Sequence, residues 1–149
     1  MATMEVTMRV GDIMQTELVT CPPESTVVEV AALMRDRGVG ACLVMEHREL
    51  LGIFTERDLM RLVAEGGDCR PLDVRSVMTR DVTIAPPDAD VIWAADTMKR
   101  IRARHLPVGE GGQVVGMVSL RDLFAAAEAV LRLNPDGAAT AREMLKAAR

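Results

Sequence analysis

The sequence predicts an α/β (α+β) fold in which two copies of one helix-strand-strand-helix unit, each with a short leading strand, pack about a pseudo-twofold axis. Three observations lead to this prediction. The chain has 149 residues, enough for one domain or two small repeats. Its hydrophobic fraction of 49% and charged fraction of 27% are typical of a globular protein. A gapless internal repeat divides most of the chain into two similar halves.

The repeat has an offset of 64 residues, so that 10–60 superposes on 74–124 with 13 identities in 51 positions. Average composition would give about three or four. The identical residues, numbered in the first copy, are Val10, Met14, Pro22, Pro23, Val27, Ala31, Met34, Val44, Glu46, Gly52, Arg57, Asp58 and Leu59. Because a unit of about 50 residues buries little of its own surface, the two copies are expected to pack against each other.

Each copy predicts the same elements in the same order. A Pro-Pro turn, at 22–23 and 86–87, precedes a helix with apolar residues at i, i+3, i+4 and i+7. Those apolar residues are Val27, Val30, Ala31 and Met34 in the first copy and Val91, Ala94, Ala95 and Met98 in the second. Two short strands follow, and the sequence places them at 41–45 and 50–55, and at 106–108 and 114–119.

A closing helix ends each copy. It begins at Thr55 in the first copy and at Ser119 in the second, directly after the second strand. Its predicted apolar stripe consists of Leu59, Leu62 and Val63 in one copy and of Leu123, Phe124 and Ala127 in the other.

The boundaries follow from turn-forming residues. Gly66-Gly67 and the cluster at 134–137 interrupt the helical patterns. The predicted segments are a lead at 1–9, a first repeat at 10–65, a linker at 66–73, a second repeat at 74–131 and a C-terminal helical tail at 132–149. The tail is expected to be an accessory, with a dimer contact as its candidate role.

Composition excludes several classes of function. A net charge of −4 argues against general nucleic-acid binding, which needs a broad cationic face. The apolar runs are shorter than the roughly 20 residues of a membrane span, and the first residues lack a secretory pattern, so cytoplasmic residence is expected. The three cysteines form no C-x-x-C pair, and the two histidines lack partners at metal spacing. Neither a metal site nor an enzyme is therefore predicted.

One tetrapeptide marks the junction of strand and closing helix in both copies. It reads Thr55-Glu56-Arg57-Asp58 and Ser119-Leu120-Arg121-Asp122. A hydroxyl three residues before an acid is the pattern of a capping box, which needs no ligand. An arginine beside free helix N-terminal amides favours an anion, however, and a short Asp can accept hydrogen bonds from the two hydroxyls of a ribose. The junction therefore fits either a cap or a nucleotide site.

At these residues the sequence resembles the cystathionine-β-synthase (CBS) domains, in the stand-alone tandem known as a Bateman module. The resemblance covers about 10–127. It rests on the segments GIFTERD and GMVSLRD, the run RHLPV at 104–108, the similar openings at 10–14 and 74–78, and the doubled Pro-Pro turns. It implies two clefts between the repeats that bind adenosine-type ligands such as AMP, ADP, ATP, S-adenosylmethionine or NAD(H).

The resemblance also implies roles for individual residues. Asp58 and Asp122 would hold ribose hydroxyls, and Thr55, Ser119, Arg57 and Arg121 would face phosphate. Thr20 and the backbone near Val39-Gly40 and Arg104-His105 would line the base and ribose, and Ile53 and Met117 complete the predicted ligand-binding set.

The two clefts are not expected to be equivalent. The proline that the family carries before a strand valine is Pro107 in the second copy but Leu43 in the first, and Thr20 is replaced by Ile84. The run 99–105 also carries four fixed positive charges. The simpler interpretation of this run is a solvated helix end. The functional interpretation is that Arg104, in preference to Arg102, points toward a phosphate.

The leading hypothesis is a regulatory module that senses an adenine nucleotide and acts in trans on an effector protein, because no effector domain is predicted on this chain. The family implies a homodimer. The alternative is a scaffold for dimerisation or protein interaction, in which the two junctions are helix caps and no ligand binds.

Overall fold

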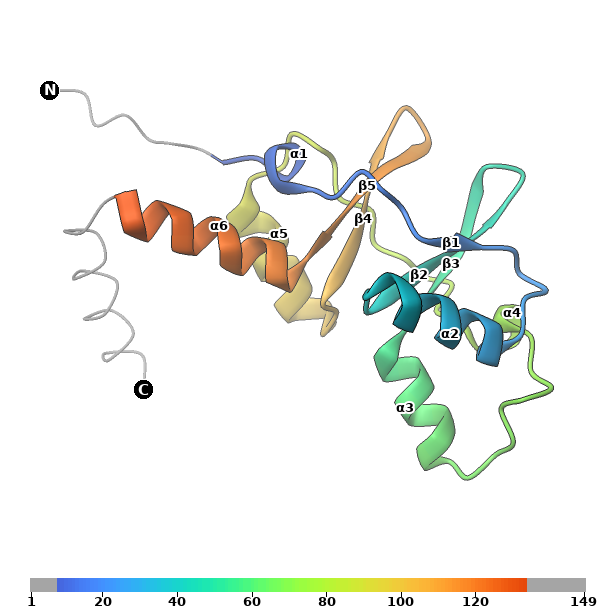
Figure 1. Cartoon of the computed structure of the whole chain (residues 1–149). Helices are drawn as coiled ribbons and strands as arrows, with labels where there is room; N and C mark the ends of the chain where they lie inside the picture. The colour runs from blue at the N-terminus through green and yellow to red at the C-terminus, as the bar shows by residue number, and fades with distance from the viewer. Residues whose placement is uncertain (1–7, 134–149) are drawn as a thin grey trace, which may run out of the picture.

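The computed structural model describes residues 8–133, which form two lobes linked by two long connections (Figure 1). The predicted tail lies outside the described residues from 134 onward. The elements are α1 (Val10–Ile13), β1 (Thr20–Cys21), α2 (Val27–Arg37), β2 (Ala41–Glu46), β3 (Glu49–Thr55), α3 (Glu56–Ala64), α4 (Val74–Val77), α5 (Val91–Ile101), β4 (His105–Glu110), β5 (Gln113–Ser119) and α6 (Leu120–Leu133). The predicted helix-strand-strand-helix order is confirmed in both copies, as α2-β2-β3-α3 and α5-β4-β5-α6.

Two small sheets carry the repeat. In the first, β1 is parallel to β2, and β2 is antiparallel to β3. The second is the antiparallel pair of β4 and β5, with a register shift after Val108 that matches the shift after Val44 in the first hairpin. The leading strand is a strand only in the first copy, since Ala85 makes a single parallel bridge to Val108. The two hairpins therefore share the same backbone irregularity, whereas the leading strands of the two copies differ.

Local hydrogen bonds fix the ends of the first helix in each copy. Thr26 begins α2 with a capping box, and Gly38 ends it in the left-handed region at φ 64°. Asp90 begins α5 by accepting from the amide of Ile92, and Arg102 ends it at φ 56°. Arg102 thus has the conformation that glycine adopts most readily. The positive run at 99–105 spans this left-handed end of α5.

Each repeat begins with a lead segment that contains a short helix, α1 or α4, and that packs in the opposite half of the molecule. Val10 of α1 is fully buried in the core of the second repeat, and its amide donates to the carbonyl of Ala89 at 2.8 Å. Val74 of α4 is fully buried in the core of the first repeat, and its amide donates to the carbonyl of Ser25 at 2.8 Å. Each half therefore completes the core of the other, and the two connections in Figure 1 cross between the lobes.

Glycine allows the lead segments to approach the sheets closely. A Cβ at Gly52 would lie 2.7 Å from Met78 Sδ and 2.7 Å from the carbonyl oxygen of Thr79. The corresponding Gly116 faces Met14 in the same way. These two glycines are identical in the repeat because a side chain at either place would push the lead segment off the sheet.

A third apolar cluster joins the two lobes. Its buried members are Ala41, Leu43 and Ile53, all from the first sheet. Val114 and Met117 of β5 pack against them, together with other partly buried residues. The strands of the two repeats therefore face each other in this shared core.

The closing helices differ from the prediction in which apolar side chains they bury. Leu59, Leu62 and Leu123 pack against the cores as predicted. Val63 is 63% exposed and Phe124 is 77% exposed, and Ala127 is exposed as well. The predicted stripe was wrong at these three residues because the face by which each closing helix packs on its own repeat is narrower than the stripe. Among residues 8–133, the helices all lack the length and apolar character needed to cross a bilayer.

Candidate ligand-binding site

Both junction motifs form the capping box that their sequence allows. In the second copy, the amide and hydroxyl of Ser119 donate to Asp122 Oδ2 at 2.7 and 2.6 Å, and the Asp122 amide donates to Ser119 Oγ at 3.2 Å. In the first copy, the amide and hydroxyl of Thr55 donate to Asp58 Oδ2 at 2.9 and 2.7 Å. Capping therefore uses one carboxylate oxygen of each Asp and leaves Oδ1 for a second role.

The Oδ1 atoms of the two acids have different partners. Asp122 Oδ1 accepts from Gln15 Nε2 at 3.1 Å, and this contact is exposed. Asp58 Oδ1 accepts from Arg61 Nη2, and the Asp58 residue is only 5% exposed. The two junctions are thus alike in their backbone but not in the chemistry that they offer to a ligand.

A cleft of about 860 Å³ lies between the repeats at the second junction. The segment before β1, the start of β2, the end of β5 and the start of α6 form its walls. It contains eight of the predicted ligand-binding residues, namely Val39, Gly40, Arg104, His105, Met117, Ser119, Arg121 and Asp122. Residues from both repeats therefore meet in this cleft, as the tandem predicts.

The other predicted residues lie elsewhere. Thr55, Arg57 and Asp58 lie at the first junction, outside the 860 Å³ cleft. Ile53 is buried in the cluster that joins the lobes. Thr20 is exposed on β1 and does not line the cleft, although its neighbour Val19 does. The five predicted residues outside the cleft thus lie at the first junction, in the cluster that joins the lobes and on β1.

Some lining residues were missed by sequence reasoning. Gln15, Glu17 and Leu18 belong to the lead segment, and they reach the cleft because that segment crosses to the other lobe. Glu56 and Glu128 come from the two closing helices. The bridge between Gln15 and Met117 brings the lead segment to the end of β5, and no local pattern in the sequence indicates this pairing.

The cleft combines two cations with several acids. Arg104 and Arg121 line it, and so do the carboxylates of Glu56 and Asp122. Burial and the positive charge of Arg104 lower the pKa of His105, which favours the neutral imidazole at this place. Glu17 and Glu128 also line the cleft but pair with arginines, Glu17 with Arg37 at 3.5 Å and Glu128 with Arg132 at 2.6 Å. The charge that remains in the cleft is therefore divided between two arginines and two carboxylates.

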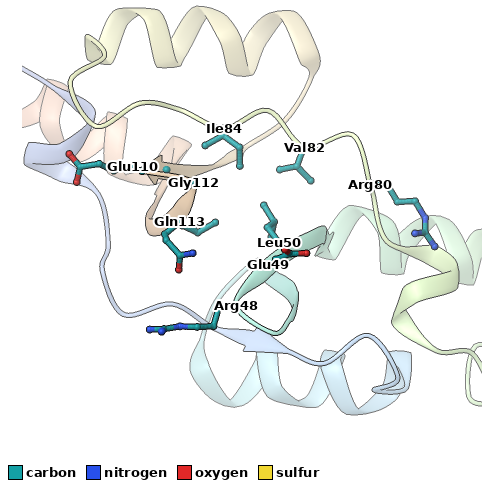
Figure 2. A pocket seen from close by; sticks show the side chains of 12 residues that line it. Arg48, Glu49, Leu50, Arg80, Val82, Ile84, Glu110, Gly112 and Gln113 are labelled. Atoms are coloured by element: carbon teal, nitrogen blue, oxygen red, sulfur yellow. The ribbon is translucent and has the colours of Figure 1, made fainter.

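A second cavity of about 580 Å³ lies at the tips of the two hairpins (Figure 2). Leu50, Val82 and Ile84 give it an apolar wall, and Arg48 and Glu110 lie at its rim. None of the predicted ligand-binding residues lines it. We therefore assign the candidate site to the Asp122 cleft.

The family model of the CBS domain matches this sequence twice, at residues 10–65 and at residues 74–129. The chain is 35% identical to the CBS domain-containing protein YhcV of Bacillus subtilis over 115 residues, which are 76% of this chain and 81% of that protein. Its fold is similar to that of the CBS-domain containing protein ATU1752 from Agrobacterium tumefaciens, with a TM-score of 0.78 and 27% identity over 85% of this chain and 98% of that one.

It is also similar to the CBS domain pair of protein MJ0100, whose crystal structure contains 5-methylthioadenosine and S-adenosyl-L-methionine. The TM-score is 0.73 with 25% identity, over 80% of this chain and 98% of that one. Two consecutive family matches, the repeated fold and these relatives agree with the resemblance seen in the sequence. The chain belongs to the CBS domain family, as a tandem pair of CBS domains.

Proposed function

We propose that the chain is a regulatory module that binds an adenosyl ligand in the Asp122 cleft. The observation that carries this proposal is the position of Asp122 and Arg121, which lie together in a cleft of about 860 Å³ between the two repeats. The binding of 5-methylthioadenosine and S-adenosyl-L-methionine by the CBS pair of MJ0100 supports this class of ligand. AMP, ADP and ATP are the nucleotide candidates, and NAD(H) is a further one.

Different residues of the cleft contact the ribose, the adenine and the phosphate of the ligand. Asp122 Oδ1 accepts hydrogen bonds from the ribose hydroxyls after the amide of Gln15 moves away, because this amide is an uncharged donor and its contact is exposed. The apolar side chains of Leu18, Val39 and Met117 offer a surface for the adenine. Arg104 and Arg121 face the part of the ligand that carries phosphate.

Regulation follows from the position of the cleft. A ligand that contacts both repeats favours the relative orientation in which both sets of contacts form, and its effect equals its difference in affinity for the two orientations. The proposal includes no catalytic step. The signal passes in trans to an effector protein, in the cytoplasm.

We also propose a homodimer formed through the closing helices. Met60 of α3 and Phe124 of α6 occupy corresponding places in the repeat, and they are 65% and 77% exposed. Large apolar side chains that gather on an exposed face mark an interaction surface. A second copy would cover both helices at once.

A scaffold without a ligand is the second candidate, and the complete capping boxes at both junctions favour it. Thermal unfolding with AMP, ADP, ATP, S-adenosylmethionine and NADH, each at about 1 mM, distinguishes the two functions. A ligand with a dissociation constant near 10 μM adds about 2.7 kcal/mol to the free energy of unfolding at this concentration. A raised midpoint with one of them supports the sensor, and unchanged midpoints with all of them support the scaffold.

A further inference from the structure

The place of Ala125 in the second repeat is taken by Arg61 in the first. Ala125 lines the Asp122 cleft, where its methyl group leaves room beside the carboxylate. Arg61 instead extends its guanidinium to Asp58 and forms an ion pair with Oδ1. At the helix position three residues after the acid, the second repeat thus has a small side chain and the first repeat has a long cation.

This contact occupies the second carboxylate oxygen of Asp58. Its Oδ2 accepts from the amide and hydroxyl of Thr55, and its Oδ1 accepts from Arg61. Both acids accept on Oδ1, but the donor at Asp58 is a cation and the donor at Asp122 is an uncharged amide, so the contact at Asp58 adds the attraction of two opposite charges. A ribose hydroxyl would therefore displace Arg61 at greater cost than it displaces the neutral amide of Gln15 at Asp122.

The residues that follow the first helix of each repeat also differ in size. The small residues Gly38, Gly40 and Ala41 line the Asp122 cleft. The residues at the corresponding places in the second repeat are Arg102, Arg104 and His105, and the carbonyl of Arg102 lies at the first junction beside Arg57.

The arginines of the two junctions differ in the same direction. Arg57 Nη1 donates to the carbonyl oxygen of Arg102, so its guanidinium joins the two repeats across the first junction. Its counterpart Arg121 lines the open cleft, and within residues 8–133 it forms no ion pair. The first junction therefore satisfies its own acid and its own cation, whereas the second leaves a cation for a ligand.

We propose that Arg61 closes the first cleft by acting as the counter-ion of Asp58, so that each chain binds one adenosyl ligand, in the Asp122 cleft. The inference rests on the proposed function. It makes Arg61 the residue that sets the number of sites, and it predicts that loss of the Arg61 side chain creates a second site.

Isothermal titration calorimetry with AMP and with S-adenosylmethionine as probes tests the number of sites. The variants are Arg61→Ala, which copies the second repeat, the control Arg61→Lys, which keeps the cation, and the reciprocal Ala125→Arg. Arg61 is exposed, with 60% of its side chain accessible, so its replacement leaves the cores intact. We expect one site in the wild type and in Arg61→Lys, two in Arg61→Ala, and about tenfold or more loss of affinity in Ala125→Arg.

A ligand-free measurement examines the closure itself. A water-soluble carbodiimide with an amine nucleophile, followed by peptide mapping, reports which carboxylates are accessible. We expect labelling of Asp122 but not of Asp58 in the wild type and in Arg61→Lys, and labelling of both in Arg61→Ala.

Two sites in the wild type, or equal labelling of both acids in the wild type, would overturn the inference. Absence of binding of either probe to every variant would overturn the proposed function, and the labelling would then decide separately whether Arg61 shields Asp58.

Discussion

Val10 and Val74 occupy the same place in the two repeats, and each is buried in the core of the opposite half. Val10 packs with Ala94 and Val108 of the second repeat, whereas Val74 packs with Val27 and Val30 of the first. The exchange means that neither half has a complete core without a segment of the other. We infer that the two repeats unfold together, although their sheets are separate.

This interdependence predicts the effect of cavities in the exchanged segments. Val10→Ala and Val74→Ala should each lower the free energy of unfolding by about 2 kcal/mol, because each removes buried methyl groups and leaves a cavity. Urea unfolding followed by circular dichroism and by tryptophan fluorescence measures this change. The only tryptophan, Trp93, lies in the second repeat.

The control for these cavities is Val28→Ala, because Val28 lies on α2 and is 47% exposed. It should change the free energy of unfolding by less than about 0.5 kcal/mol. Two separate transitions in Val74→Ala, with fluorescence changing later than circular dichroism, would contradict the interdependence of the repeats.

The acids of the two junctions predict different phenotypes. Asp122→Ala should weaken an adenosyl ligand by about 1.5 to 3 kcal/mol, the range for hydrogen bonds to a charged group. Asp58→Ala should leave that affinity unchanged and lower stability by about 1 kcal/mol or more, because it removes a cap and leaves the hydroxyl of Thr55 without its acceptor. Calorimetry and thermal unfolding of both variants check these effects. Equal losses of affinity in the two variants would contradict the assignment of the site to Asp122.

The internal repeat made most of the fold predictable. Identities such as Pro22 and Asp58 mark turns and caps, which are local features that sequence spacing reports directly. The strands Ala41–Glu46 and His105–Glu110 contain the predicted ranges. Element order and turn positions were therefore accessible from the sequence.

The exchange of the lead segments was not accessible, and neither were the cleft residues that this exchange contributes. The repeat shows that Val10 resembles Val74, but similarity does not indicate which lobe each residue packs against. Gln15 reaches Asp122 only because of this exchange. Arg61 carries no signal in a single copy, since an arginine on an exposed helix is common, and its meaning appears only beside Ala125 and the ion pair with Asp58.

The partly buried histidine His105 predicts a dependence of stability on pH. The pKa of His105 is lowered from 6.5 by burial and by the cation of Arg104, while Glu56 and Asp122 oppose this shift and Arg121 adds to it. A histidine with a lowered pKa in the folded state contributes stability above its unfolded pKa and loses it as pH falls through the folded value. The midpoint of thermal unfolding should therefore fall as pH decreases below about 6.5.

The chain contains one other histidine, which serves as the matched control. His105→Gln should flatten the decrease of the midpoint between pH 7 and 5, and His47→Gln should not, because His47 lies in an exposed turn. Midpoints measured in a buffer series at constant ionic strength give the two slopes. A His105→Gln protein that keeps the slope of the wild type would show that other groups cause it.

The closing helices predict how a dimer dissociates. Phe124→Glu, alone and together with Met60→Glu, should convert a dimer to a monomer, because charges replace apolar side chains at corresponding exposed places on α6 and α3. Neither side chain belongs to a core cluster, so stability at low concentration should change by less than about 0.5 kcal/mol. Analytical ultracentrifugation over a range of concentrations measures the mass. Ile92→Glu is the control, since Ile92 is 67% exposed but lies on α5. Dissociation by Ile92→Glu with an intact dimer in Phe124→Glu would place the interface on α5 instead of on the closing helices.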